Sequence, residues 1–531
     1  MSFVHRFEGL TLAAVLANRA TSDPNGAYLR YRQDVVTFGQ VELQAEALAA
    51  GLANLGLEQG DRMALVLPPC PEFVVSMFAA AKLGLVIVPL NPRLTSAELQ
   101  YALRHSGAMC AVTIEQIDGL HYLELFEEFT QQLPELRHLI AVGQGDFWFD
   151  EGVFQFQELM SSGVGRDYPV ATVDPDNACF ALVYTSGTMG KPKGVELSHT
   201  NLISVAAGTA DAIGLSAEDR IIGVTALFHL WGLGPGILSS LLAGASIVLL
   251  SEVGAGPTLN GIDQHDATVH YGMPTLFLEE IAELEVSDRD LSSLRLAVIA
   301  GAPVRPELVE KLSEALGVLV TTAYSLTETA STVSASCPAD TFEQRCLSAG
   351  RPIGETRLRL LELDGSELFP DGVGQITVSG AGVMLGYYRQ PRETMAAFDE
   401  DGYFLTGDLG FLDENGCLRL VGRLKDVIIR SGFNVYPREV ETRIEAHPAV
   451  QEVVVVGVPD ELLGEAICAC IVPIEGAIVT GQEVMDWCRE TLADDKVPDF
   501  VRFIDELPRT DTGQVRRTDL SRLAQPEGQS V

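Results

Sequence analysis

Short apolar runs without polar alternation recur through the first 330 residues of the chain. Such runs are typical of parallel strands that are covered on both faces. Helical patterns separate them, and one of these begins at Pro306, in keeping with the preference for proline in the first turn of a helix. The alternation predicts a doubly wound α/β body. The predicted strands are Met63–Leu67, Val86–Leu90, Ala178–Tyr184, Ser246–Leu250, Leu296–Ala300 and Val318–Thr322.

The pattern changes at about residue 350, where short strands alternate with Asp-Gly and Asn-Gly turns. Turns of this composition are typical of hairpins, and we expect residues 350–421 to form a small barrel-like part. A polar joint follows at Gly422–Asp426, and the last hundred residues predict a compact α+β set. The expected fold is therefore α/β, with an N-terminal body of doubly wound sheets and a small β-barrel at 1–423 and a small mobile C-terminal α+β lid domain at 424–531.

Residues 221–250 contain no Asp, Glu, Lys or Arg, and this length is sufficient for a membrane span. Gly232–Gly236 interrupts the stretch with three glycines and a proline, and Ala243–Ala245 interrupts it again. A strand, a loop, a buried helix and a second strand fit this pattern better. We therefore expect no integral membrane segment, and the first 20 residues also lack the pattern of a secretory signal.

The charge of the chain argues against a nucleic-acid partner. There are 73 acidic and 36 basic residues, which gives a net charge of -37. Such a balance repels a phosphate backbone, so an anionic substrate must be bound by a local set of donors. The nine cysteines form no CxxC pair, and the nine histidines form no HExxH motif. These features argue against a disulfide scaffold or a zinc site and favour a cytoplasmic protein with reduced thiols.

The segment Tyr184–Gly194 is the strongest local signal in the sequence. It follows a predicted strand and contains two of the six lysines of the chain. Hydroxyl, ammonium and backbone N–H donors can wrap a polyphosphate, and glycine allows the backbone to approach it closely. The segment is not a Walker A loop, because proline follows its first lysine. The candidate donors are Thr185, Ser186, Gly187, Thr188, Gly190, Lys191 and Lys193.

This segment resembles the phosphate-binding signature of the acyl-adenylate-forming superfamily, which includes acyl- and aryl-CoA synthetases, luciferases and nonribosomal adenylation domains. Met189 stands where the signature usually has Thr or Ser. Further motifs follow in the family's order over nearly the whole chain, and the resemblance is strongest to fatty-acyl-CoA synthetases. It implies ATP, Mg²⁺ and coenzyme A as ligands, with an acyl-adenylate as the intermediate.

The resemblance assigns roles to residues of two further motifs. Tyr324 would stack on adenine, Thr327 would contact the α-phosphate and Glu328 would hold Mg²⁺, which prefers carboxylate oxygen. Asp408 and Arg423 match the family's ribose contacts.

Two residues near the predicted lid match family positions that concern the second half-reaction. Lys425 stands at the family's hinge, about which the lid turns between the two half-reactions. Gly432 stands in the segment that lines the narrow tunnel for the pantetheine arm of coenzyme A. A side chain at this position would occupy the space of the incoming thiol.

The last motif of the family departs from its usual form at Gln514, where the family has lysine. In the family, that lysine places a positive charge between the attacking carboxylate and the α-phosphate. An amide donates hydrogen bonds but does not offset developing negative charge equally well. We therefore expect Gln514 to slow formation of the adenylate by roughly 10²–10³.

The resemblance also places a set of residues around the carboxylic acid and the adenine. Their apolar character favours a fatty or aromatic acid over a dicarboxylate, and Trp231 favours an acyl group of modest length. His229 either lies near the substrate carboxyl or is an ordinary core residue. The residues are His229, Trp231, Tyr271, Gly272, Met273, Gly301 and Ala302.

The sequence therefore predicts an ATP-dependent carboxylic acid:CoA ligase, whose partners are a small-molecule acid, ATP and CoA. A homodimer is compatible with the sequence. Two alternatives stay open: a stand-alone adenylating enzyme that loads a carrier protein, and a degenerate protein that binds a nucleotide or an acyl-adenylate without turning it over.

Overall fold

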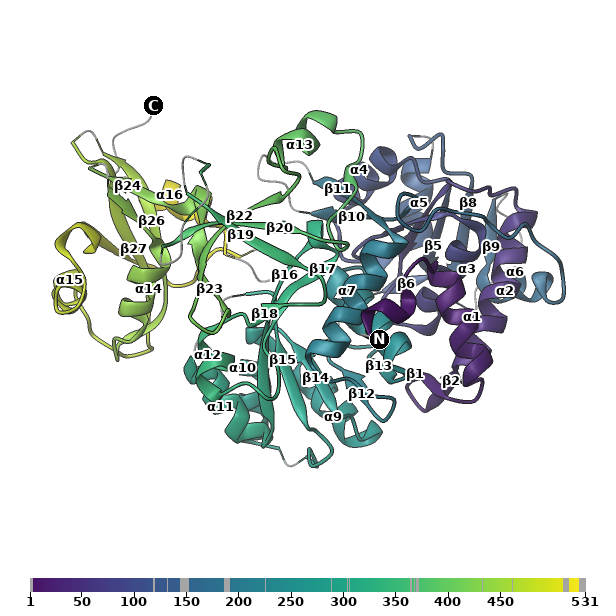
Figure 1. Cartoon of the computed structure of the whole chain (residues 1–531), viewed down its shortest axis with the longest axis horizontal. Helices are drawn as coiled ribbons and strands as arrows, with labels where there is room; N and C mark the ends of the chain where they lie inside the picture. Colours follow the sequence, from purple (N-terminus) through teal and green to yellow (C-terminus); the bar gives the residue numbers. More distant parts are fainter. Residues whose placement is uncertain are drawn as a thin grey trace. The chain divides into compact units, whose positions relative to one another are not determined.

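The computed structural model describes residues 3–524 except 118–119, 131, 144–151, 186–191, 225, 288, 303, 305, 363–364, 367, 369–371, 432, 461 and 510–514. It divides into two compact units (Figure 1). Unit 1 comprises Met1–Leu358 and Val378–Phe404, and unit 2 comprises Arg359–Thr377 and Leu405–Val531. Each unit contains its own hydrophobic clusters.

The larger sheet of unit 1 has a parallel centre and antiparallel edges. The strands from β16 to β1 are parallel, whereas β17, β18 and β2 are antiparallel to their neighbours. The spatial order is β18 (Arg351–Pro352), β17 (Ser331–Ala335), β16 (Leu319–Leu326), β15 (Leu296–Ile299), β14 (Val269–Gly272), β12 (Arg220–Ile222), β13 (Ser246–Leu249), β1 (Ala27–Tyr31) and β2 (Asp34–Thr37).

The second sheet of unit 1 is also mixed. Its antiparallel part is the edge formed by β21, β11 and β10, and the strands from β10 to β9 are parallel. The order is β21 (Gly386–Tyr387), β11 (Lys193–Ser198), β10 (Cys179–Thr185), β4 (Val86–Pro89), β3 (Arg62–Val66), β5 (Cys110–Ile114), β8 (His138–Val142) and β9 (Val153–Gln155). A short pair, β6 (Gln116–Ile117) and β7 (Leu120–His121), lies outside both sheets.

Helices cover both faces of each sheet, which explains the apolar runs in the sequence. One cluster joins both sheets to α1 (Leu12–Ser22), α2 (Phe38–Asn54), α3 (Pro71–Leu83), α7 (His199–Ala212) and α8 (Ser239–Ala243). A second packs α4 (Ser96–Ser106) and α5 (Tyr122–Thr130) on the other face of the second sheet, and a third packs α9 (Ala255–His265), α10 (Pro274–Leu284) and α11 (Pro306–Leu316) on the larger sheet. Met63 and Leu65 of β3 belong to the first cluster, and Ala64 and Val66 belong to the second. Successive side chains of a strand point to opposite faces, so a strand covered on both faces is apolar throughout.

Shorter helices complete unit 1. They are α6 (Phe156–Gly163), α12 (Phe342–Leu347) and α13 (Pro391–Ala396), with 3₁₀ turns at Val4–Phe7 and Thr327–Thr329.

The stretch 221–250 folds within unit 1 as β12, a π-helix at Gly232–Leu238, α8 and β13. The predicted break at Gly232–Gly236 was wrong, because the π-helix runs through it with Pro235 inside and all seven of its residues buried. Pro235 has no backbone N–H to donate to a helical hydrogen bond. Among the described residues, no helix has both the length and the apolar character that crossing a bilayer requires.

Unit 2 contains most of a small barrel-like sheet and an α+β part. The first has the order β19 (Arg357–Leu361), β20 (Gly374–Ser379), β22 (Phe404–Leu412) and β23 (Leu418–Arg423). The second contains β25 (Phe433–Val435), β24 (Ile428–Arg430), β27 (Gly464–Pro473), β26 (Val450–Asp460) and β28 (Phe500–Phe503), with α14 (Pro437–Glu445), α15 (Gly481–Arg489) and α16 (Arg517–Ala524). Further 3₁₀ turns lie at Leu424–Asp426 and Asp494–Lys496.

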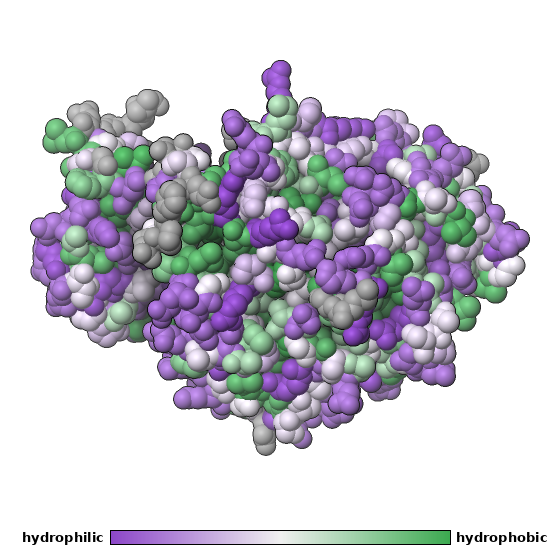
Figure 2. All heavy atoms as spheres, in the orientation of Figure 1, coloured by the Kyte–Doolittle hydropathy of each residue, from purple (hydrophilic) through white to green (hydrophobic). Residues whose placement is uncertain are grey.

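The expected fold class is confirmed: an α/β protein with large mixed sheets, a barrel-like sheet and a small C-terminal domain. The domain boundary between residues 423 and 424 stays a prediction. Hydrophilic residues cover most of the face shown in Figure 2, in keeping with the high content of acidic residues.

Candidate active site

Neighbouring parallel strands of the larger sheet carry the predicted site residues at their carboxyl ends. β12, β14, β15 and β16 lie next to one another in the sheet. Gly272 ends β14, Gly301 follows β15, and Tyr324 lies near the end of β16, just before Thr327 and Glu328. In open α/β sheets, ligands bind at this edge. The structure thus brings together residues that lie more than 50 positions apart in the sequence.

The predicted wall for the acid contains two aromatic rings in contact. The ring centroids of Trp231 and Tyr271 are 5.4 Å apart. Tyr271 is fully buried, whereas Trp231 is partly exposed. The indole N–H of Trp231 and the hydroxyl of Tyr271 are buried and have no hydrogen-bond partner within the described residues. Burial raises the pKa of Tyr271, so its hydroxyl stays protonated and the wall is uncharged.

The side chain of His229 is accessible to solvent. Its Nδ1 accepts a hydrogen bond from the backbone N–H of Trp231 at 3.3 Å. The surrounding protein atoms desolvate the imidazole and lower its pKa, which favours the neutral ring. The predicted role of His229 near the substrate carboxyl stays a prediction.

Two predicted glycines serve different purposes. Gly301 has a φ of +88°, a conformation that favours glycine, and a Cβ there would lie 3.5 Å from the side chain of Met273. Gly301 and Met273 are therefore direct neighbours, and Ala302 beside them is exposed. A Cβ at Gly272 would lie 2.7 Å from the ring of Phe277. Packing of α10 against β14 accounts for this glycine without any ligand.

The ends of the predicted phosphate loop are held by a hairpin and by helix α4. Thr185 and Lys193 pair directly in the β10–β11 ladder, and Ser186, Gly187, Thr188, Gly190 and Lys191 lie outside the described residues. The hydroxyl of Tyr184 is 2.8 Å from Nδ1 of His105, and the hydroxyl of Tyr101 donates to the carbonyl of Pro192 at 3.2 Å. Both Tyr101 and His105 belong to α4. These two residues belong to none of the predicted motifs, because only the tertiary structure brings α4 to the ends of the loop.

A tyrosine that the sequence analysis did not select lies between Lys193 and Glu328. The Nζ atom of Lys193 is 4.5 Å from the centroid of the Tyr387 ring. The hydroxyl of Tyr387 donates to Oε1 of Glu328 at 2.9 Å. Tyr387 thereby links the strand that follows the phosphate loop to the turn at the end of β16. No sequence signal singles it out from the neighbouring Tyr388.

In unit 2, the two predicted ribose contacts lie beside each other. Asp408 and Arg423 are direct partners in the β22–β23 ladder, and their side chains form an ion pair with 3.2 Å between Oδ1 and Nε. Lys425 lies in the 3₁₀ turn Leu424–Asp426 that follows β23. Gly432 and Gln514 lie outside the described residues.

The chain matches two models of one protein family. The model of the AMP-binding enzyme matches residues 16–388, and that of the AMP-binding enzyme C-terminal domain matches residues 439–514. The first match alone covers more than half of the chain.

The chain belongs to the AMP-binding enzyme family. The resemblance to the acyl-adenylate-forming superfamily is thus confirmed, and so is the expected activity class, an AMP-forming acid–CoA ligase.

Relatives that are acyl-CoA or aryl-CoA ligases agree with this assignment. The mitochondrial medium-chain acyl-CoA ligase ACSF2 of Bos taurus is 32% identical over 91% of this chain and 82% of its own length. The anthranilate CoA ligase AuaEII, solved in complex with anthranoyl-AMP, has a TM-score of 0.86 and 28% identity, with 99% of both chains covered. The ATP-bound MatB of Rhodopseudomonas palustris has a TM-score of 0.86 and 28% identity, covering 97% of this chain and 99% of MatB.

Glu328 of this AMP-binding enzyme fits the Mg²⁺ that the family implies. Its carboxylate is partly exposed, and Oε1 accepts the hydrogen bond from Tyr387. No hydrogen bond to Oε2 is formed within the described residues. A carboxylate with one oxygen oriented and the other available is a suitable ligand for Mg²⁺, which binds one or two carboxylates together with phosphate oxygens.

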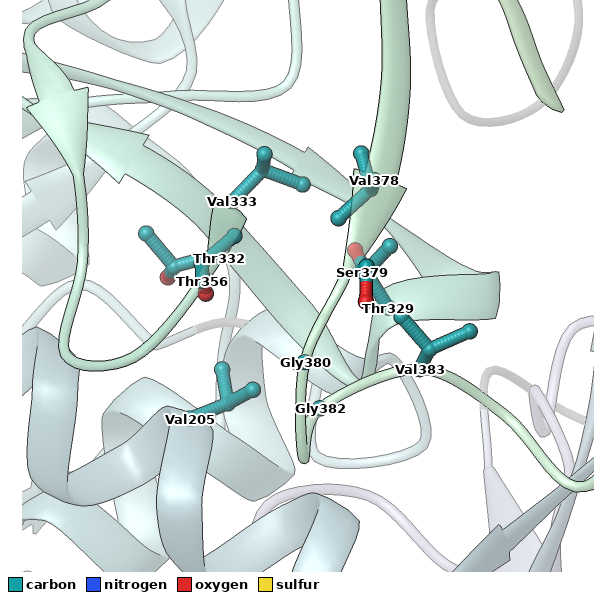
Figure 3. Close-up of a pocket in the computed structure, with 10 residues that line it drawn as sticks. All are labelled: Val205, Thr329, Thr332, Val333, Thr356, Val378, Ser379, Gly380, Gly382 and Val383. Atoms are coloured by element: carbon teal, nitrogen blue, oxygen red, sulfur yellow. The ribbon is translucent and has the colours of Figure 1, made fainter. Parts of the chain in front are cut away.

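The small pocket in Figure 3 does not belong to the candidate active site. It is lined by Val, Thr, Ser and Gly residues, and none of the ten residues drawn is a predicted site residue. The pocket leaves no room for a water molecule. All ten residues belong to unit 1.

Proposed function

We propose that this AMP-binding enzyme activates a fatty or other apolar carboxylic acid with ATP and transfers the acyl group to coenzyme A. In the first half-reaction, a carboxylate oxygen of the acid forms a bond to the α-phosphorus of ATP, and the bond to the β-phosphate oxygen breaks, releasing pyrophosphate. In the second, the CoA thiol loses its proton, sulfur bonds to the acyl carbon, and AMP leaves. The observation that carries the proposal is the meeting of Lys193 and Glu328 at Tyr387.

The proposed roles are those that the resemblance to the family implies, and the charges of the residues are compatible with them. Lys193 offsets the negative charge of the phosphates, and Thr327 donates to the α-phosphate beside it. Tyr324 supplies a face for adenine, and Asp408 and Arg423 bind the ribose. Mg²⁺, when bound at Glu328, would neutralise phosphate charge. The ATP in the MatB structure and the anthranoyl-AMP in the AuaEII structure support nucleotide and adenylate binding at this fold.

The proposed acid is apolar, because its predicted wall is apolar and uncharged. Trp231, Tyr271 and Met273 supply this wall. The names of the medium-chain acyl-CoA ligase and of the anthranilate CoA ligase support a fatty or an aromatic acid. Thioester formation from C4, C8, C12 and C16 fatty acids, from benzoate and from malonate tests this point. A preference for malonate would contradict it.

We propose that Gln514 slows the first half-reaction, because its amide carries no positive charge. The Gln514→Lys variant restores a positive charge, so we expect ATP–pyrophosphate exchange to rise by about 10²–10³. A matched control supplies acyl-AMP made chemically, whose reaction with CoA we expect to be unchanged. If Gln514→Lys leaves exchange at the wild-type rate while ATP binding stays tight, the proposed role of this position is wrong.

The rotation of the lid about Lys425 and the passage of the thiol past Gly432 belong to the second half-reaction. A Gly432→Leu variant would fill the space of the pantetheine arm, and we propose that it blocks consumption of acyl-AMP by CoA without changing pyrophosphate exchange. Offering free CoA and a phosphopantetheinylated carrier protein in parallel identifies the acceptor. Faster acylation of the carrier would favour the carrier-loading alternative.

A further inference from the structure

The two sheets of unit 1 each supply one charged group of the proposed phosphate site. Lys193 begins β11 in the second sheet, and Glu328 lies in the 3₁₀ turn that follows β16 of the larger sheet. The segment that contains Tyr387 contacts both. The ring centroid of Tyr387 lies 4.5 Å from Nζ of Lys193, and the hydroxyl of Tyr387 lies 2.9 Å from Oε1 of Glu328.

The backbone fixes the position of Tyr387 at several points. Tyr387 pairs with Val195 in the β11–β21 ladder, which places it diagonally across from Lys193 on the same face. Its N–H donates to Oγ1 of Thr394 at 2.9 Å. Three residues earlier, the N–H of Met384 donates to the backbone carbonyl of Glu328 at 2.9 Å. The same short segment therefore holds both the backbone and the carboxylate of Glu328.

We propose that Tyr387 is a positioning residue for adenylate formation, which orients the Glu328 carboxylate through its hydroxyl and holds the Lys193 ammonium over its ring. The inference rests on the proposed phosphate role of Lys193 and the proposed metal role of Glu328. A hydrogen bond to one carboxylate oxygen leaves the other oxygen for a cation. The ring face attracts an ammonium group at this distance.

Two substitutions separate the contributions of the hydroxyl and the ring. Tyr387→Phe removes the hydroxyl and keeps the ring, and we expect the Mg²⁺ concentration for half-maximal binding of ATP, measured by calorimetry without acid, to rise about tenfold. We expect ATP–pyrophosphate exchange to fall by a similar factor, whereas ATP binding in EDTA stays at the wild-type value.

Tyr387→Leu also removes the ring, and we expect it to weaken ATP binding in EDTA by roughly threefold.

Tyr388→Phe is the matched control. The ring of Tyr388 lies edge-on to His105, at 5.7 Å between centroids, and under the guanidinium of Arg389. We expect this variant to match the wild type in both binding measurements and in exchange. Equal effects of Tyr387→Phe and Tyr388→Phe would overturn the proposal, because a general loosening of this strand would then explain both.

A double-mutant cycle tests whether Tyr387 acts through Glu328. We expect Tyr387→Phe to change the Mg²⁺ dependence in the wild type but not in the Glu328→Gln background. An unchanged tenfold effect in that background would overturn the proposal. The proposal would also be overturned if Tyr387→Phe slowed the reaction of preformed acyl-AMP with CoA as much as it slows pyrophosphate exchange, because that half-reaction does not use the triphosphate.

The single variants Lys193→Met and Glu328→Gln distinguish failure of this inference from failure of the proposed function. If both variants retain exchange, the phosphate and metal roles fail, and the inference fails with them. If both lose exchange while Tyr387→Phe and Tyr387→Leu behave as wild type, only the role of Tyr387 is overturned.

Discussion

The two units bring their charged site residues together in different ways. In unit 2, Asp408 and Arg423 occupy facing positions of one hairpin and pair directly at 3.2 Å. In unit 1, Lys193 and Glu328 come from different sheets and are connected through the ring and hydroxyl of Tyr387. The first pair is formed by local ladder register, whereas the second arrangement requires three distant segments to fold together.

This difference predicts how each group responds to substitution. A facing pair on a hairpin keeps its geometry as long as the hairpin exists, and Arg423 is 51% exposed, so solvent screens the pair. The groups in unit 1 are held by the packing of two sheets. We therefore expect loss of Glu328 to affect mainly the chemical step, and loss of Asp408 or Arg423 to affect mainly nucleotide affinity.

The largest expected effect is that of Glu328→Gln on the first half-reaction. Loss of the carboxylate removes the proposed ligand of Mg²⁺ and the acceptor for Tyr387, and we expect pyrophosphate exchange to fall by about 10²–10³, or ~3–4 kcal/mol. Steady-state exchange at saturating ATP measures this loss. An activity within threefold of wild type would show that the carboxylate has no part in the step.

Acid should destabilise unit 1 through His199. The buried imidazole accepts the N–H of Leu12 at its Nδ1, 3.2 Å away, and burial lowers its pKa to about 4. The unfolded chain takes up this proton near pH 6.5, so the folded state loses stability as the pH falls from about 6.5 to about 4, by up to about 3 kcal/mol. Above pH 6.5 both states are neutral at this site, and the contribution is constant.

Urea unfolding at a series of pH values measures how the free energy of unfolding depends on pH. The control is His199→Gln, whose side chain does not titrate. We expect the variant to be less stable than wild type at pH 7 and less dependent on pH between 6.5 and 4. If the free energy of unfolding depends on pH equally in the two proteins, groups other than His199 cause the acid sensitivity.

The smallest expected effect concerns the ribose contacts in unit 2. Asp408→Asn removes a charged acceptor, and we expect KM for ATP to rise by roughly 10- to 100-fold with a much smaller change in kcat.

Arg423→Gln removes the exposed partner of the same ion pair, and we expect the free energy of unfolding to change by less than about 1 kcal/mol. If Asp408→Asn lowers kcat as strongly as Glu328→Gln does, the contrast between the two units disappears.

Much of the fold could be predicted from apolar runs. The runs at Met63, Val86 and Leu296 became β3, β4 and β15, because strands covered on both faces have no polar alternation. The π-helix at Gly232–Leu238 could not be predicted in the same way. Glycine and proline are strong indicators of a break, and only burial between α7 and the larger sheet stabilises a helix there.

The site could be predicted where motifs are contiguous and was missed where it is assembled by packing. Lys193, Glu328 and Asp408 belong to short motifs in a fixed order. Tyr387, Tyr101 and His105 belong to no such motif, and their residue types are common in ordinary cores. Their proximity to the phosphate loop and to Glu328 appears only once α4 and β21 are in place.

The sequence by itself determined the class of fold, the family and the chemical groups available for the reaction, because hydropathy patterns and contiguous motifs are properties of neighbouring residues. Only the tertiary structure decided which groups meet. Ladder register placed Asp408 beside Arg423, and the packing of two sheets placed Tyr387 between Lys193 and Glu328. Contacts between segments nearly 200 residues apart depend on the path of the whole chain, which no local pattern contains.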